Sequence, residues 1–176
     1  MEKEDILEKV YETAKRYELK SGGCAQCTIA AIFDVLGVED EGVFKAATGM
    51  ADGVGLTGDG HCGALSGGTM AISYFFGRSK ENFGNVMKQV KACILAKKLH
   101  DEFVEIYGTC RCANIQEKLA GRFFNLYDPE EIKAAFKAGT PEKCSTLVGK
   151  TARMATRIIL DEREAKKGKP DQLALL

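Results

Sequence analysis

Seven cysteines are the residues of this 176-residue chain whose chemistry is most readily specified. A cysteine thiolate is both a nucleophile and a metal ligand, and its reactivity depends on the pKa that its surroundings impose. Two histidines, His61 and His100, accompany the cysteines, but no Ser-His-Asp arrangement can be inferred around either of them. The sequence therefore indicates metal binding or thiol redox chemistry.

The spacing of the cysteines excludes several familiar sites. Four of them are spread widely along the chain: Cys24, Cys62, Cys112 and Cys144. Zinc ribbons and fingers carry their ligands in closely spaced pairs, which this spacing does not match. The C-x-x-C pair Cys24 and Cys27 is followed by Thr28 where a covalent haem site needs His, and no βαβ pattern surrounds it. Four sulfurs in a tetrahedral arrangement are typical of zinc or iron–sulfur centres.

Glycine is concentrated around one of these cysteines, in residues 49–68 (GMADGVGLTGDGHCGALSGG). We expect this backbone to wrap closely around something, because the segment has no proline and few charges. Glycine lets backbone N–H groups approach and donate to sulfides and thiolates, which favours an iron–sulfur cluster over zinc. A phosphate loop is disfavoured by the absence of a Walker motif and by two aspartates. The predicted cofactor-binding residues are Gly60, Gly63, Ser66 and Gly67.

The periodicity of apolar residues predicts an all-α protein, a single-domain bundle of about six to eight helices. No segment alternates apolar and polar residues with the β-branched bias of a strand. The helical domain is expected to span residues 1–164, and the charged, aperiodic tail 165–176 is expected to be flexible. Helices are expected over about 2–18, 24–37, 41–48, 63–76, 81–107 (one helix or two separated by a bend), 112–121, 129–138 and 140–163.

All four widely spaced cysteines fall at the N-terminal ends of predicted helices. These ends carry unsatisfied N–H groups and a partial positive charge, so each can stabilise a thiolate by ~0.3 to 1 kcal/mol. Four such ends that converge would suit an anionic centre. The alternative interpretation is that each cysteine is an inert small hydrophobe, because cysteine is among the most buried residue types.

The remaining cysteines are placed differently. Cys93 lies near the apolar face of the helix predicted over 81–107 and is expected in the core. His61 is expected in an exposed loop, and His100 on a solvated helix face. Three residues are candidate auxiliary ligands because they lie close in sequence to the principal cysteines: Cys27, His61 and Cys110.

Charge and composition exclude several kinds of partner. Lys and Arg number 25 and Asp and Glu also number 25, so the chain lacks the basic excess typical of a nucleic-acid binder. No apolar run approaches the ~20 residues of a membrane span. The N-terminus lacks the apolar region of a signal peptide, which predicts a cytoplasmic protein, in a compartment where disulfides are disfavoured. The expected partner is an unidentified redox protein, and the small-residue face of the helix over 63–76 also suits a homodimer.

The order of these motifs resembles the C_GCAxxG_C_C family of redox-active proteins, from about Cys24 to Glu162. The segment CAQCTIAAIFDVLG is similar to the first-cysteine helix of that family. The segment HCGALSGG approximates its central motif, although Gly63 follows Cys62 where the family name writes Gly before Cys. The resemblance thus assigns the first two cysteines of the pattern.

The later motifs extend the resemblance. YGTCRCANIQEKLAGRFFNLYDPEE places Cys112 as the third cysteine and leaves Cys110 extra, and EKCSTLVGKTARMATRIIL places Cys144 as the fourth. A related domain accompanies the haem region of split-Soret cytochromes, where it is associated with an iron–sulfur centre. The resemblance therefore implies a 2Fe-2S cluster on the four principal cysteines, with electron transfer or redox sensing as the function.

Two alternatives to the cluster stay open, and no enzymatic reaction is specified. The first is a metal-free thiol–disulfide protein that uses Cys24 with Cys27, or Cys110 with Cys112. The second is a structural zinc module that mediates protein contacts.

Overall fold

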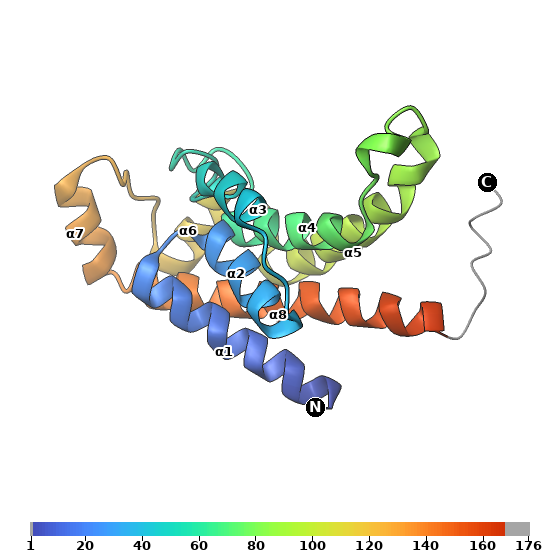
Figure 1. The fold of residues 1–176 in the computed structure, drawn as a ribbon. Coiled ribbons are helices and arrows are strands. Elements are labelled where there is room, and N and C mark those ends of the chain that lie inside the picture. The colour runs from blue at the N-terminus through green and yellow to red at the C-terminus, as the bar shows by residue number, and fades with distance from the viewer. Residues whose placement is uncertain (1, 168–176) are drawn as a thin grey trace.

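The computed structural model describes residues 2–167, and within them the protein consists of α-helices and short 3-10 helices without a strand (Figure 1). The predicted all-α, single-domain fold is confirmed. The elements in chain order are α1 (Lys3–Ser21), α2 (Cys24–Leu36), α3 (Glu41–Ala46), η1 (Thr48–Met50), α4 (Gly63–Phe76), η2 (Lys80–Asn82), η3 (Val86–Gln89), α5 (Val90–Tyr107), α6 (Cys112–Ala120), α7 (Pro129–Lys137) and α8 (Thr140–Lys167).

The small-residue helix α4 lies at the centre of the bundle, in contact with α2, α5 and α8. A Cβ added to Gly67 would lie 2.4 Å from the carbonyl oxygen of Ala25 in α2. A Cβ added to Gly68 would lie 2.9 Å from Leu99 of α5. Because neither position has room for a side chain, glycine is what allows these helices to cross so closely.

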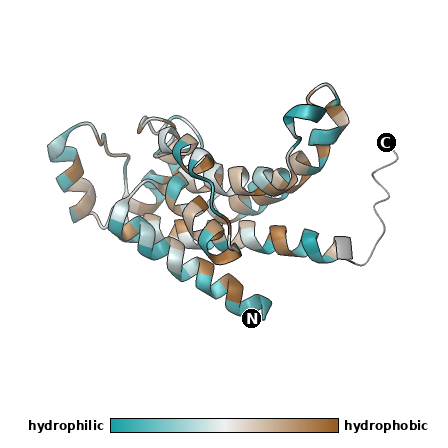
Figure 2. Cartoon of the chain, viewed as in Figure 1, coloured by the Kyte–Doolittle hydropathy of each residue, from teal (hydrophilic) through white to brown (hydrophobic). Residues whose placement is uncertain are grey.

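The longest helix, α8, runs across the lower part of the bundle in Figure 1, and α1 packs along it. Figure 2 shows hydrophobic stretches on α8 and on the helices packed against it. Arg153 on α8 pairs with Glu4 and Glu8 on the exposed side of the α1 contact. The apolar face of α8 is buried in the core and comprises Leu147, Val148, Ala152, Ala155, Ile158 and Ile159.

The predicted helix over 81–107 starts later than expected. Residues 80–89 form η2 and η3, and the α-helix begins only at Val90. The Asn85 side chain accepts a hydrogen bond from the Met87 N–H, which caps η3 and interrupts any continuous helix. Phe83 and Met87 are 72% and 57% exposed and do not belong to the core. This segment projects from the bundle at the upper right of Figure 1.

The prediction that Cys93 lies in the core is wrong, because its side chain is exposed. The buried face of α5 runs through Ala92, Leu95, Leu99 and Phe103. This register directs Cys93 outward, since residues one position from a buried stripe lie about 100° around the helix.

None of the helices in the described range combines the length and the apolarity that crossing a bilayer requires. Helix α8 continues to Lys167, beyond the predicted domain end at residue 164. The last part of the predicted tail, residues 168–176, lies outside the described residues.

Candidate functional site

One cavity of about 380 Å³ is lined by all four widely spaced cysteines. Cys24 is the first residue of α2 and Cys62 is the N-cap of α4. Cys112 is the first residue of α6, and Cys144 lies close to the start of α8. Tertiary packing thus brings four helix starts, distant in sequence, to one site.

Gly63 allows the starts of α2 and α4 to approach each other. A Cβ at this position would lie 2.2 Å from Cys24 Sγ and 2.9 Å from the Met50 carbonyl oxygen. Even the smallest side chain would therefore displace the Cys24 sulfur or separate the helices. A glycine directly after Cys62 has a definite packing function in this chain.

None of the four predicted cofactor-binding residues belongs to the cavity wall: Gly60, Gly63, Ser66 and Gly67. Two of them, Gly60 and Ser66, form backbone hydrogen bonds with cysteines of the site. The Gly60 carbonyl accepts a hydrogen bond from the Cys112 N–H at 3.0 Å, and the Ser66 N–H donates to the Cys62 carbonyl at 3.1 Å. A direct role toward a cofactor stays a prediction for these four.

The glycine-rich loop contains a turn of left-handed backbone. The φ angles are positive at five successive residues: Asp52 (49°), Gly53 (77°), Val54 (66°), Gly55 (58°) and Leu56 (60°). This conformation costs an L-residue ~1 to 2 kcal/mol and is rare for a β-branched residue such as Val54. Hydrogen bonds from the Gly55 N–H to the Gly49 carbonyl and from the Gly58 N–H to the Asp52 carbonyl hold the turn. The turn places Asp52 and Leu56 at the cavity wall.

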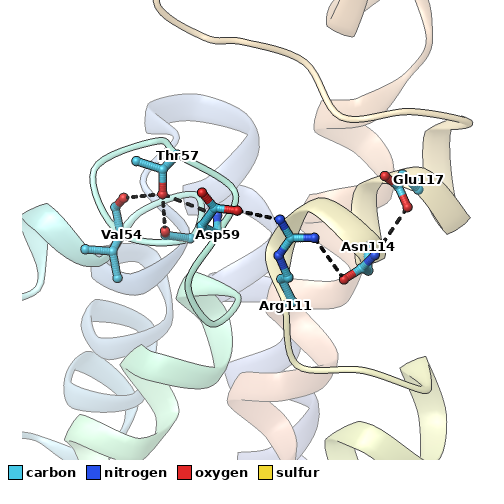
Figure 3. A network of polar contacts seen from close by, with 7 residues as sticks. Val54, Thr57, Asp59, Arg111, Asn114 and Glu117 are labelled. Atoms are coloured by element: carbon cyan, nitrogen blue, oxygen red, sulfur yellow. Dashed lines mark hydrogen bonds and ion pairs between the residues drawn. The ribbon is translucent and has the colours of Figure 1, made fainter.

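Polar contacts tie the same loop to the start of α6 (Figure 3). Arg111, which directly precedes Cys112, forms an ion pair with Asp59 of the loop. Its guanidinium also donates to Asn114 at 3.4 Å, and Asn114 in turn donates to Glu117 at 3.3 Å. This network orients the first turn of α6 against the loop and so places Cys112 at the cavity.

Asp52 connects two of the cysteines. Its carboxylate accepts a hydrogen bond from Cys112 Sγ at 2.9 Å and another from the Gln116 side-chain amide. Its backbone N–H donates to the sulfur of Cys24. A single loop residue therefore contacts cysteines from two different helices.

Four buried oxygen atoms at the cavity wall have no hydrogen-bond partner among the described residues: Glu18 Oε2, Asp52 Oδ2, Gln116 Oε1 and Thr140 Oγ1. A buried polar atom without a partner costs ~1 to 3 kcal/mol. Gln116 and Thr140 are only 4% and 8% exposed. Their place at one cavity, beside the cysteines, indicates a site built to hold a polar or metallic group.

The sequence interpretation missed these four residues as parts of the site. Gln116 lies four residues after Cys112, and Thr140 lies four residues before Cys144, so each shares a helix face with a cysteine. That spacing is a signal that could have identified both. Glu18 and Asp52 reach the site through tertiary contacts, and no local pattern indicates them.

Burial controls the ionisation of the thiols. It raises the pKa of Cys62 to about 11, although the N–H groups of Ala64 and Leu65 donate to this sulfur and oppose the shift. Burial also raises the pKa of Cys144 to about 12 and those of Cys24 and Cys112 well above the usual value. The expected stabilisation of thiolates by helix ends is therefore outweighed in the metal-free protein. A bound cation would reverse this balance, because metal ligation requires and stabilises the thiolate.

The candidate auxiliary ligands lie outside the cavity wall. Cys27 is buried, and its Sγ donates to the Gly22 carbonyl at 3.0 Å. Cys110 is half-buried, and its carbonyl accepts from the Cys62 N–H at 2.8 Å. His61 is exposed, as predicted, with its ring 6.4 Å from that of His100.

No three His, Cys, Asp or Glu side chains within residues 2–167 are placed to hold one metal ion. A single tetrahedral ion would need three or four of the cysteines to converge at one point. A binuclear 2Fe-2S cluster asks for two cysteines at each iron, since bridging sulfides complete the coordination. The four cysteines at the cavity are donors of the type and number that zinc and iron–sulfur centres both use.

Fold and site together define a helical protein that gathers four cysteines, two of them buried and two half-buried, around one cavity. The family model described as "Putative redox-active protein (C_GCAxxG_C_C)" matches residues 23–158, and the chain belongs to this family. The resemblance inferred from the motifs is confirmed. No curated protein and no solved structure gives a match to the chain.

Proposed function

We propose that this protein carries a 2Fe-2S cluster on Cys24, Cys62, Cys112 and Cys144, and that it transfers electrons or senses redox state through that cluster. The observation that carries the proposal is the gathering of four cysteines from four helix starts at one cavity. Membership of a redox-active family supports the same class of chemistry.

The backbone around the cysteines suits an anionic cluster. Two N–H groups at the start of α4, those of Ala64 and Leu65, donate to Cys62, and the Asp52 N–H donates to Cys24. Hydrogen bonds to cluster sulfurs help to set the reduction potential. When bound, the cluster would supply one-electron transfer. Because the protein has a net charge of zero, its overall charge does not neutralise the negative charge of the cluster, and these N–H groups would offset that charge locally.

The partner in this proposal is another redox protein that donates or accepts the electron. Its approach is expected at the part of the cavity wall that α7 and the end of α1 form, because the lining residues Leu19, Ile132 and Phe136 there keep exposed surface.

No observation favours the metal-free thiol–disulfide alternative. Cys27 and Cys110, which the two exchange pairs require, do not belong to the cavity wall, and all seven cysteines are free thiols. Burial raises the pKa values of Cys24, Cys27 and Cys112, which also opposes it, because the thiolate is the species that attacks a disulfide. The zinc alternative is disfavoured by the spacing of the four cysteines, which lacks the close pairs of zinc ribbons and fingers.

The deciding experiment is the assay of iron and acid-labile sulfide in anaerobically purified protein, combined with visible absorption and electron paramagnetic resonance of the reduced state. We expect iron and sulfide in equal amounts, about two of each per chain. A colourless protein that contains zinc, or one that contains no metal and cannot be reconstituted with iron and sulfide, would contradict the proposal.

A further inference from the structure

Two chemically different groups of residues line the cavity. The first group, which we call the cysteine side, comprises the four cysteines and the residues with unpartnered oxygens: Glu18, Asp52, Gln116 and Thr140. The second group, which we call the apolar side, includes Leu126, Ile132, Ala135 and Phe136. A volume of about 380 Å³ falls within the range of pockets that bind small organic molecules. A four-cysteine cluster alone does not account for the apolar side.

Helix α7 supplies much of this apolar side. It stands apart from the central helices in Figure 1 and carries hydrophobic residues in Figure 2. Ile132 and Phe136 line the cavity, yet they remain 36% and 68% exposed. These two side chains therefore have apolar surface available to a ligand that enters beside α7.

The unpartnered oxygens define what the polar end of such a ligand must offer. Carboxylate oxygens of Glu18 and Asp52 and the amide oxygen of Gln116 are acceptors only, so they ask for a donor. The Thr140 hydroxyl also accepts. Among the described residues, Lys20 is the one cationic side chain at the cavity wall, against the two carboxyl groups of Glu18 and Asp52. A cation with several donors satisfies both the hydrogen-bonding and the charge requirement.

We propose that the cavity binds a small organic ammonium ion, whose ammonium group lies among the unpartnered oxygens and whose apolar body lies against α7. An ammonium carries three donors and no acceptor, which matches the oxygens of the cysteine side. The inference rests on the proposed function in one respect, because the ligand would occupy the part of the cavity that the cluster leaves free.

The test is a calorimetric titration of the anaerobically purified protein at pH 7.5 with benzylammonium, and in parallel with benzyl alcohol and benzoate. All three probes share one apolar body and differ in charge. We expect benzylammonium to bind at least about tenfold more tightly than either of the others, since a charge-assisted hydrogen bond is roughly twice as strong as a neutral one. Equal affinity for the three probes, or no binding of benzylammonium, would overturn the inference.

Variants locate the bound probe. Phe136→Ala and Thr140→Val should each weaken benzylammonium binding by about threefold to tenfold, because one removes apolar contact and the other one hydrogen bond. Thr140→Ser keeps the hydroxyl and should bind like the unchanged protein. Phe83→Ala is the matched control, since Phe83 lies on the projecting segment outside the cavity wall. Binding that is insensitive to both cavity variants would place the probe elsewhere and refute the site.

Iron and sulfide are measured on the same samples, which separates the two proposals. Protein with a full cluster that does not bind benzylammonium refutes the ammonium site and leaves the cluster standing. Protein that lacks a cluster and cannot be reconstituted with iron and sulfide, but binds benzylammonium with the expected loss in the cavity variants, supports the ammonium site and contradicts the proposed function.

Discussion

Gly63 and Cys24 pack so closely that a Cβ on the glycine would lie 2.2 Å from the cysteine sulfur. The contact joins the starts of α4 and α2, the two helices that carry the first and second cysteines of the site. One absent methyl group therefore determines whether these two sulfurs can share a cavity.

This contact predicts a local effect of Gly63→Ala. The added methyl group must displace Cys24 or the start of α4, so we expect a loss of about 1 to 3 kcal/mol in the free energy of unfolding and loss of the bound metal. Urea unfolding and iron analysis measure the two effects. Gly84→Ala is the matched control, because a Cβ at Gly84 meets nothing within 4 Å. Equal stability and equal iron content in both variants would contradict the role assigned to Gly63.

The four-cysteine site predicts that Cys112→Ser and Cys93→Ser differ sharply. Cys112 lines the cavity and contacts Asp52, whereas Cys93 is exposed on α5. We expect Cys112→Ser to lose most of the iron and the visible absorption, and Cys93→Ser to retain both. Iron and sulfide assays on the two proteins, purified side by side without oxygen, check this. The assignment fails if both variants hold the same amount of cluster.

The raised thiol pKa values predict how the stability of the metal-free protein depends on pH. The pKa of Cys62 is raised to about 11 and that of Cys144 to about 12, while an unfolded thiol titrates near ~8.5. Between pH 8.5 and 10 the native state therefore holds more protons than the unfolded state, and stability falls as pH rises. Each such thiol contributes a loss of up to ~1.4 kcal/mol per pH unit in this window.

Urea unfolding of metal-free, reduced protein at pH 7, 8.5 and 10 measures this dependence. The double variant Cys62→Ser, Cys144→Ser should show a weaker decline, because serine does not titrate in this range. An unchanged slope in the double variant would show that other groups cause the decline.

The unpartnered hydroxyl of Thr140 predicts an effect of opposite sign to the usual core substitution. Thr140→Val removes a buried oxygen that bonds to nothing in the described chain, so the metal-free variant should be at least as stable as the parent. Thr151→Val is the comparison, since the Thr151 hydroxyl donates to the Leu147 carbonyl at 2.8 Å. In thermal unfolding, Thr151→Val should have a lower melting temperature than Thr140→Val. The reverse order would contradict the assignment of Thr140 to a ligand site.

The predicted ranges of most helices agree with the structure to within a few residues. In the structure, Asp128 accepts a hydrogen bond from the Glu130 N–H as the N-cap of α7, and Gly37 and Gly121 end their helices in the left-handed conformation. Helix ends can be predicted from sequence because capping depends on residues a few positions apart. The predicted ranges also placed the four principal cysteines at helix starts before any tertiary contact was considered.

The periodicity of apolar residues gave a wrong prediction where local backbone interactions interrupt the helix. Residues 80–89 carry apolar side chains at helical spacing, but Gly84 and the Asn85 cap favour 3-10 turns, and Phe83 is left exposed. Cys93 was misplaced for a related reason, since a small shift in the register of an amphipathic helix moves a residue from its buried face to its exposed face.

The sequence by itself determined the helical class, the caps and the assignment of each principal cysteine to a helix start, because these depend on neighbours along the chain. Only the tertiary structure decided that the four helix starts meet at one cavity. It also decided that Glu18 and Asp52 stand beside the sulfurs, and that burial outweighs the helix ends in the pKa of each thiol. Those outcomes depend on close packing between distant segments, such as Gly63 against Cys24. No periodic pattern in the sequence indicates such a contact.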